Sequence, residues 1–244
     1  TSDGDLRWEY ETDGWVTASP VLGIDRLYIG SHDGFLYALG TEDGERMWWH
    51  RTGGPIVGGA ALLGYNIFVG STDNYLYALD TSRGELLWRY RTGGDIVSTP
   101  AVDADTVYVG SVDRKLYALD SASGEPRWVF EAGDAIESSP AVAEDVVYFG
   151  ANDGKIHALR AADGRLLWQH QAGDTVRSAP VVWGDLVFAG SDDGYLYALD
   201  RATGTPVWRY RTAGPIAAGP AVADGGLFVG STDRYLHAFD LGSE

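Results

Sequence analysis

A repeat of 40 residues is the feature that most constrains the fold of this chain. Six tryptophans stand 40 residues apart with no insertion or deletion between them: Trp8, Trp48, Trp88, Trp128, Trp168 and Trp208. Most follow a near-copy of Ala78 to Trp88, in which an Ala-Leu-Asp turn and a glycine precede the tryptophan, while Trp8 follows only its second half. A fixed period of this length indicates a repeat architecture.

One repeat has the pattern of four short strands. In the third repeat we expect strands at residues 86–91, 96–102, 106–109 and 115–119, each bounded by Gly, Asp, Ser or Asn. Such short connections are typical of an antiparallel meander. One four-stranded sheet leaves both of its faces uncovered, whereas sheets arranged radially cover one another, as in a β-propeller. A linear solenoid is the competing architecture, but it needs polar end caps, and the sequence shows none.

We therefore predict an all-β fold, a six-bladed β-propeller of four-stranded antiparallel blades that occupies residues 1–244 as a single domain. Ten and eleven residues after each tryptophan every side chain is small, which suits the innermost strand near a crowded axis. The last repeat stops at Asp240, before its own tryptophan-bearing strand, and the chain begins with such a strand. We expect the N-terminal strand to close the last blade in a 3+1 arrangement.

Composition and charge exclude several classes of function. The formal net charge is −17 over 244 residues, and such an acidic surface repels the nucleic-acid backbone. The sequence has no cysteine, which excludes disulfides and thiolate metal sites. It has neither an apolar run long enough to span a membrane nor a targeting segment. Because it starts at Thr1, we expect a processed product or an excised domain; the acidity suits a secreted protein and a salt-adapted organism equally.

The repeated motif resembles that of a known family. The pattern Ala-x-Asp-x-x-x-Gly-Glu-x-x-Trp at residues 78–88 and 118–128 is similar to the tryptophan-docking motif of pyrroloquinoline-quinone-like (PQQ-like) propeller repeats. The resemblance covers all six repeats and implies that the tryptophans dock one blade on the next, each indole N–H bonding a backbone carbonyl of the adjacent blade. It leaves function open, since the same repeats occur in quinoprotein dehydrogenases, outer-membrane-assembly scaffold lipoproteins and kinase-linked sensors.

Two further columns of the repeat have structural interpretations. An aspartate recurs in one hairpin of every repeat, where we expect it to form the turn, with calcium binding as the alternative. The residue after it is expected to be left-handed, which strains Arg114 and Arg234. A tyrosine column contains two histidines, which we interpret as packed substitutes and not as ligands. The two columns are Asp33, Asp73, Asp113, Asp153, Asp193 and Asp233, and Tyr37, Tyr77, Tyr117, His157, Tyr197 and His237.

Function is expected where the repeats differ, in the loops at one mouth of the channel. Glu137 and Arg177, in neighbouring blades, are expected to face one another as an ion pair, with a ligand site as the alternative. Trp49 and Trp183 stand elsewhere and either mark a contact surface or cover a neighbouring strand. The candidate ligand face comprises Trp15, His32, Asp95, Arg114, Lys115, Glu137 and Arg177.

We predict a non-catalytic binding, sensor or scaffold module without a cofactor. The expected partner is a protein, a peptide or a small ligand at the channel mouth, and the domain is expected to be monomeric and extracytoplasmic, within a larger extracytoplasmic or kinase-linked protein. One alternative is a PQQ-dependent dehydrogenase-related domain, although relatives of that kind use more blades, calcium, a catalytic aspartate and often adjacent cysteines. Another is an engineered or consensus-like propeller scaffold with no ligand.

Overall fold

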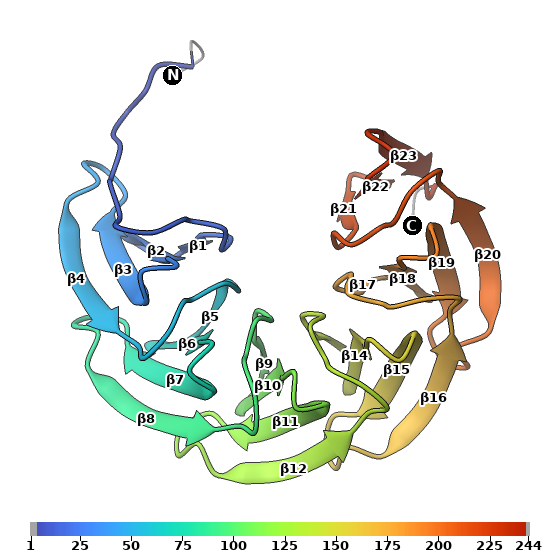
Figure 1. Cartoon of the computed structure of the whole chain (residues 1–244), viewed down its shortest axis with the longest axis horizontal. Helices are drawn as coiled ribbons and strands as arrows, with labels where there is room; N and C mark the ends of the chain where they lie inside the picture. Colours follow the sequence, from blue (N-terminus) through green and yellow to red (C-terminus); the bar gives the residue numbers. More distant parts are fainter. Residues whose placement is uncertain (1–3, 243–244) are drawn as a thin grey trace.

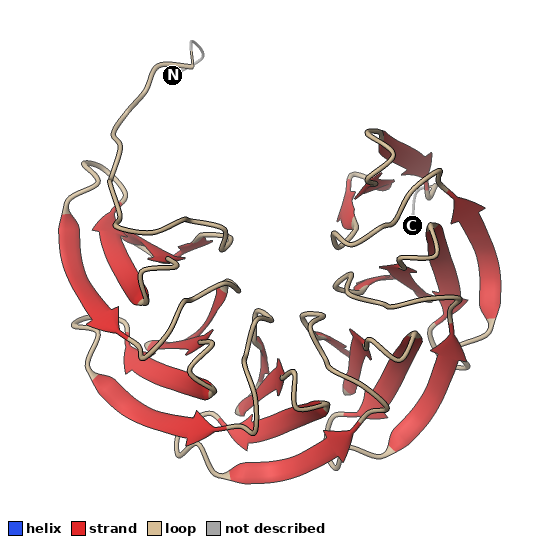
Figure 2. Ribbon diagram, viewed as in Figure 1, coloured by secondary structure: helices blue, strands red, loops and turns tan. Residues whose placement is uncertain are grey.

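The computed structural model describes residues 4–242 and is built from short antiparallel strands joined by turns and loops. Six sheets stand radially around a common axis, each with its strands in consecutive order from the axis outward (Figures 1 and 2). The predicted all-β propeller architecture is confirmed. Over the described residues, no helix is long and apolar enough to cross a membrane.

Each sheet, called a blade below, corresponds to one repeat. Blade 1 contains β1 (Val21–Leu22), β2 (Arg26–Gly30), β3 (Phe35–Gly40) and β4 (Arg46–Arg51); blade 2 contains β5 (Ala60–Leu63), β6 (Asn66–Gly70), β7 (Tyr75–Asp80) and β8 (Leu86–Arg91); blade 3 contains β9 (Ala101–Asp103), β10 (Thr106–Gly110), β11 (Lys115–Asp120) and β12 (Pro126–Glu131). Blade 4 contains β13 (Ala141–Ala143), β14 (Val146–Gly150), β15 (Lys155–Arg160) and β16 (Leu166–Gln171); blade 5 contains β17 (Val181–Trp183), β18 (Leu186–Gly190), β19 (Tyr195–Asp200) and β20 (Pro206–Arg211); blade 6 contains β21 (Ala221–Ala223), β22 (Gly226–Gly230) and β23 (Leu236–Asp240).

The innermost strand is shorter than the sequence pattern predicts. In blade 3 the expected strand covered residues 96–102, but β9 begins only at Ala101. The preceding residues bond elsewhere: the Ile96 N–H donates to the Ser71 carbonyl, and the Ser98 hydroxyl donates to the Gly110 carbonyl. Pro100 has no N–H to give to a sheet. The predicted strand is therefore confirmed only from Ala101, and the polar groups before it fix the blade to its neighbour and to its own second strand.

The small residues beside the axis lie where neighbouring blades crowd together, as predicted. A Cβ placed on Gly58 would lie 2.6 Å from the Ser98 carbonyl oxygen of the next blade. Ser138 donates a 2.9 Å hydrogen bond to the Ser178 carbonyl one repeat further on. Larger side chains would separate the blades at the axis.

The tryptophans join consecutive blades, as the family resemblance implied. The indole N–H of Trp48 in blade 1 donates to the Thr81 carbonyl of blade 2 at 3.0 Å, and Trp88 reaches Ser121 in the same way. The motif glycine is required here because its φ is +70° at Gly84 and a Cβ there would lie 2.4 Å from Trp48. The repeated motif therefore forms a contact between neighbouring blades.

The repeated aspartate forms the hairpin and fixes the preceding link between blades. Asp73 accepts the Tyr75 N–H at 3.0 Å on Oδ1, and the Gly53 N–H and Tyr77 hydroxyl, each at 2.6 Å, on Oδ2. Both carboxylate oxygens are thus used by the protein, which confirms the turn-forming interpretation. Burial, followed by this hydrogen bond, raises the pKa of Tyr77 to about 12. The next residue is left-handed as predicted, with φ of 72° at Asn74 and 74° at Arg114.

His157 breaks this arrangement. It is 2% exposed, its ring stacks on Phe149 with centroids 4.7 Å apart, and neither ring nitrogen has a hydrogen-bond partner among the described residues. The equivalent position of Phe149 holds a smaller side chain in the other blades, such as Val109 or Ala189. A larger neighbour therefore occupies the space that tyrosine fills elsewhere. This burial lowers the pKa of His157 to about 4, with Lys155 acting in the same direction and Asp153 against it.

The predicted 3+1 closure is absent. Blade 6 has three strands, and residues 4–20 contribute no strand to any described sheet. Instead, the Trp8 indole N–H donates to the Thr41 carbonyl of blade 1 at 3.1 Å, as the tryptophan of a preceding blade would. Figure 1 shows an opening between blades 1 and 6, with the N-terminal segment on one side and β23 on the other. The side chains of Trp8 and Tyr10 pack on blade 1, and the outer edge of β23 has no partner strand among the described residues.

His157 should make stability depend on pH. Its pKa of about 4 in the folded chain lies below the ordinary 6.5, so the unfolded state takes up the proton first as pH falls. We expect the free energy of unfolding to decrease by up to about 3 kcal/mol as the pH falls from 6.5 to about 4. The double variant Phe149→Val/His157→Tyr should lose this pH-dependent part of the stability, because it has no histidine at position 157. Its tyrosine can bond Asp153, as the equivalent Tyr77 bonds Asp73. The measurement is urea unfolding from pH 7.5 to pH 4.

The single variant Phe149→Val is the matched control, since it retains His157 and should retain the pH dependence. If the double variant loses stability as steeply as the wild type over this range, His157 is not the responsible group.

Candidate functional site

Two sets of loops form one end of the propeller, called the mouth below. The segment that enters each blade before its innermost strand is called the link. It lies beside the hairpin between the second and third strands of the same blade, because a backbone hydrogen bond joins the link to the hairpin. The His32 N–H donates to the Trp15 carbonyl at 2.9 Å, and Val112 donates to Asp95 at 3.0 Å. The same bond recurs in all six blades, so the candidate residues occupy equivalent places around the mouth.

In three blades, the side chain two residues beyond the link bonds a hairpin side chain 15 residues later. Thr17 Oγ1 lies 2.7 Å from His32 Nε2; the Asn152 amide donates to Glu137 at 2.9 Å; Arg177 donates to Asp192 at 2.5 Å. The other three blades have Val57 with Thr72, Val97 with Val112, and Ala217 with Thr232 at these positions. We call these six combinations the mouth pairs. They differ from blade to blade in charge, size and hydrogen-bonding capacity.

The predicted ion pair between Glu137 and Arg177 is wrong. Each side chain instead bonds the hairpin of its own blade, Glu137 to Asn152 and Arg177 to Asp192. The reason is the meander itself, which places the link and the hairpin of one blade side by side. A contact between the two side chains would have had to cross from blade 4 to blade 5.

Trp15 is the most prominent side chain at the mouth. It is 79% exposed, and its ring centroid lies 5.9 Å from that of His32. A shallow hollow beside it is lined by Thr12, Asp13, Gly14, Trp15 and His32. The structure therefore brings these two candidate residues together in an exposed aromatic corner.

Three other candidates lie at this end without joining that corner. Arg114 donates to Glu131 at 3.3 Å, and the Lys115 backbone N–H donates to Asp113. Asp95 accepts through its backbone carbonyl. No hydrogen bond or ion pair in the described part of the chain links these three to Trp15 or His32. The candidate face is thus a ring of separate positions and not one constellation.

Sequence reasoning missed Asn152 and Asp192, which complete two of the mouth pairs. Each of the two stands 15 residues after a position that differs from repeat to repeat, so this spacing was the signal in the sequence. It became meaningful only once the link and hairpin were known to be neighbours.

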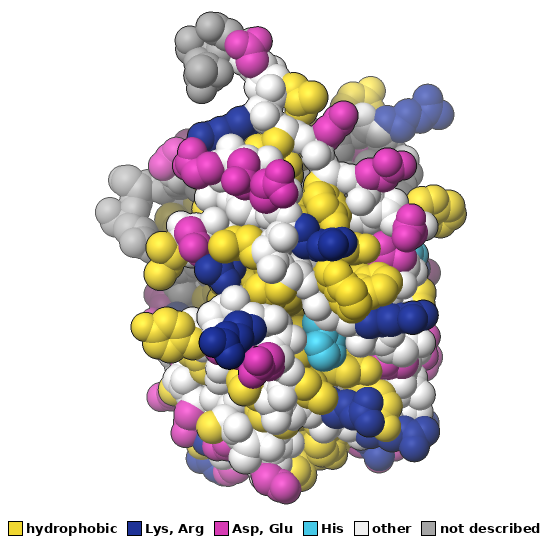
Figure 3. Space-filling view, turned by 90° about the vertical axis from the view of Figure 1, so that its left-hand side faces the viewer, with side chains coloured by type: hydrophobic (Ala, Val, Ile, Leu, Met, Phe, Trp, Pro, Cys, Tyr) yellow, Lys and Arg dark blue, Asp and Glu magenta, His cyan; other side chains and the backbone are white. Residues whose placement is uncertain are grey.

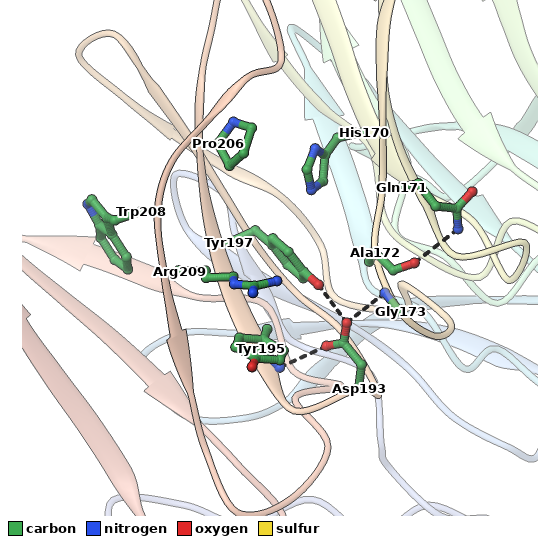
Figure 4. Close-up of a pocket in the computed structure, with 10 residues that line it drawn as sticks. All are labelled: His170, Gln171, Ala172, Gly173, Asp193, Tyr195, Tyr197, Pro206, Trp208 and Arg209. Carbon is green, nitrogen blue, oxygen red and sulfur yellow. Dashed lines mark hydrogen bonds between the residues drawn. The ribbon is translucent and has the colours of Figure 1, made fainter.

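The outer wall carries a groove of about 450 Å³ between blades 4 and 5 (Figure 4). Arg209 stacks 4.5 Å over Tyr195, and His170 lies beside Tyr197 with centroids 5.2 Å apart. Asp193 is bonded to Tyr195, Tyr197 and Gly173, as the dashed lines in Figure 4 show. The arginine–tyrosine stack recurs in blade 2, where Arg89 lies 4.7 Å over the Tyr75 ring.

The remaining tryptophans mainly cover neighbours. Trp183 is half-buried and packs in the apolar cluster between blades 5 and 6. Trp49 is 48% exposed and meets the Phe35 ring edge-on at 4.9 Å. On the side of the molecule that lies at the left of Figure 1, Lys and Arg side chains are interspersed with hydrophobic ones (Figure 3). Charged residues beside exposed outer strands discourage edge-to-edge association.

The arrangement supports binding better than acid–base or metal chemistry. Within residues 4–242, no three His, Cys, Asp or Glu residues are grouped in a way that could hold a metal ion. The small residues beside the axis offer hydroxyls and methyl groups where a quinone–calcium site of the dehydrogenase kind would need carboxylates and amides. The variable chemistry lies at the mouth pairs and Trp15.

Comparison with known proteins places the chain in a family. No curated protein sequence matches it. A crystal structure of BamB from Moraxella catarrhalis is similar in fold, with a TM-score of 0.64 and 22% identity over 96% of this chain and 88% of that one. The computationally designed Ika8 protein has a TM-score of 0.66 and 16% identity over 92% of this chain and 83% of that one.

A family model described as the outer membrane protein assembly factor BamB matches residues 1–61 and 49–241. Because the two matches together span nearly the whole sequence, the chain belongs to the BamB-like family of PQQ-like β-propellers.

Proposed function

We propose that this chain is a non-catalytic propeller module that binds a protein or an extended peptide at the mouth. The observation that carries the proposal is the contrast between the framework and the mouth pairs. Tryptophan, aspartate and small-residue positions repeat in nearly every blade, whereas the six mouth pairs all differ. A surface whose residues vary on a fixed scaffold is suited to recognition of one partner.

The chemistry of the mouth suits a polypeptide. Trp15 supplies a large exposed aromatic surface of the kind that anchors protein interfaces. Around the mouth, two of the pairs offer both hydrogen-bond donors and acceptors: Glu137 with Asn152, and Arg177 with Asp192. A third pair, Val97 with Val112, is apolar. Such mixed surfaces resemble ordinary protein–protein contacts, which combine apolar anchors with a polar rim.

Family membership supports the same proposal. The matching family model carries the description outer membrane protein assembly factor, which names a protein that takes part in the assembly of outer membrane proteins. By analogy we place this chain in an extracytoplasmic compartment, as a scaffold or sensor module. The analogy concerns the family and does not identify the partner.

The peptide-binding proposal can be tested with a phage-displayed library of twelve-residue peptides. Peptides selected on the wild-type chain should lose at least tenfold in affinity for Trp15→Ala, since a buried aromatic anchor contributes more than about 1.4 kcal/mol. Fluorescence anisotropy with the selected peptides provides the measurement.

Trp49→Ala is the matched control, because it removes another partly exposed tryptophan, on the outer wall. Peptides that bind Trp15→Ala as tightly as the wild type, or a library that yields no enriched peptide, would contradict binding at the mouth.

The dehydrogenase alternative is separated by titration with PQQ and calcium. We expect no saturable binding and no dye-linked oxidation of alcohols, because the axis lacks the side chains that would hold the pair. Tight binding accompanied by dye reduction would overturn the non-catalytic proposal.

A further inference from the structure

Blade 6 exposes apolar side chains that every other blade buries. Leu236 of β23 is 72% exposed, whereas the equivalent residue is 0% exposed in each of the other blades. Phe228 of β22 is 38% exposed, and its equivalents are exposed by at most 2%. The outer edge of β23 has no partner strand among the described residues. In the other blades these side chains are covered by the tryptophan of their own outer strand and by the following blade, as Phe188 and Leu196 are. An unpaired edge of this kind can accept an added strand.

The N-terminal segment has the sequence of the missing strand. Residues 6–11, Leu-Arg-Trp-Glu-Tyr-Glu, stand in the same repeat positions as β12 of blade 3, three repeats earlier. We call residues 4–12 the arm. Its side chains are partly used, because Arg7 pairs with Glu42 at 2.8 Å, Trp8 bonds Thr41 and Tyr10 packs 5.4 Å from Tyr37. Its backbone pairs with no described strand.

The register of blade 3 shows how the arm would pair with β23. There Ala118 lies opposite Trp128, and Lys115 lies opposite Glu131. The equivalent residues in β23 lie three repeats later, and those in the arm lie three repeats earlier. In this register Ala238 would lie opposite Trp8, and Tyr235 opposite Glu11.

Charges agree with this register. In blade 3, Arg114 pairs with Glu131 at 3.3 Å, and Arg127 pairs with Asp120 at 2.8 Å. The corresponding combinations are Arg234 with Glu11, and Asp240 with Arg7, which would exchange its exposed ion pair with Glu42 for one with Asp240. Both are opposite in sign, so the arm and the edge of β23 are complementary in apolar pattern and in charge.

The contact that Trp8 makes with blade 1 does not prevent such pairing. Trp48 lies opposite Ala38 in its own blade and at the same time reaches Thr81 in the next one. A tryptophan in this position therefore serves a strand pair and a contact between blades together. The arm can add to a three-stranded blade without leaving Thr41.

We propose that the arm of a second copy of this chain supplies the fourth strand of blade 6. Within one copy the arm and β23 lie on opposite sides of the opening (Figure 1). A two-fold axis parallel to the propeller axis, with the two openings face to face, brings each arm to the β23 edge of the other copy. The exchange is reciprocal and closes as a dimer, which is the commonest symmetry of homo-oligomers. This arrangement replaces the monomer expected from the sequence.

Disulfide trapping between separately labelled chains tests the proposal, and the absence of natural cysteine makes it clean. One chain carries Glu11→Cys and the other Tyr235→Cys, with different affinity tags. Residues directly opposite in an antiparallel pair lie roughly 4.5–5.5 Å apart at Cα, a distance that a disulfide spans. We expect a covalent heterodimer to form on mild oxidation, in at least tenfold greater yield than in the control.

The matched control pairs Tyr235→Cys with Arg211→Cys. Arg211 occupies the same repeat position as Glu11 but is already paired with Tyr195 in its own blade. A yield no higher than this control would overturn the proposal. So would a disulfide that forms only within one chain of the double variant Glu11→Cys/Tyr235→Cys, because that result means closure inside a single copy.

Deletion of residues 1–12 gives a second measurement. The shortened chain should remain folded, since blade 1 keeps its four strands, and should sediment as a monomer under conditions where the full chain is a dimer. A dimer that persists after the deletion would show that the arm is not the junction. If the deletion impairs folding, the trapping experiment with the full chain still decides.

Discussion

The contact between each tryptophan and the following blade is the interaction on which the rest of the structure depends. A four-stranded blade has two apolar faces and is not stable alone, so its neighbours must be held at a fixed distance and angle. The indole ring lies on a left-handed glycine, and its N–H bonds a carbonyl of the next blade. The aspartate of each hairpin bonds the link between blades at the mouth. Two kinds of contact thus join each blade to the next.

Because these contacts use the same atoms in each blade, they leave other positions free to vary. The mouth pairs need only be compatible with one another within a blade, and they range from a charged pair to two valines. His157 shows the opposite case, in which a change inside the framework is accompanied by a larger neighbour, Phe149. Variation at the mouth costs little stability, whereas variation in the core requires compensation.

Much of the fold followed from the sequence because its signals were local and repeated. The period, the antiparallel strands of each repeat, the turn-forming aspartates and the left-handed residues after them depend on neighbours in the chain. The 3+1 closure failed because it requires the two ends of the chain to meet, which depends on all six repeats together and is not encoded in any one of them. The Glu137–Arg177 pair failed for a related reason, since proximity around the ring was inferred without knowing that the link lies beside its own hairpin. The candidate ligand face was placed at the right end of the molecule, but its organisation into pairs within each blade required the structure.

We infer that the tryptophan contact joins blades and is not part of a ligand site. The free energy of unfolding of Trp88→Ala tests this inference, with Trp15→Ala as the exposed counterpart. We expect a loss of ~3–5 kcal/mol for Trp88→Ala, because a large packed aromatic side chain is removed, and a change within about 0.5 kcal/mol for Trp15→Ala. Equal and small losses for the two variants would contradict it.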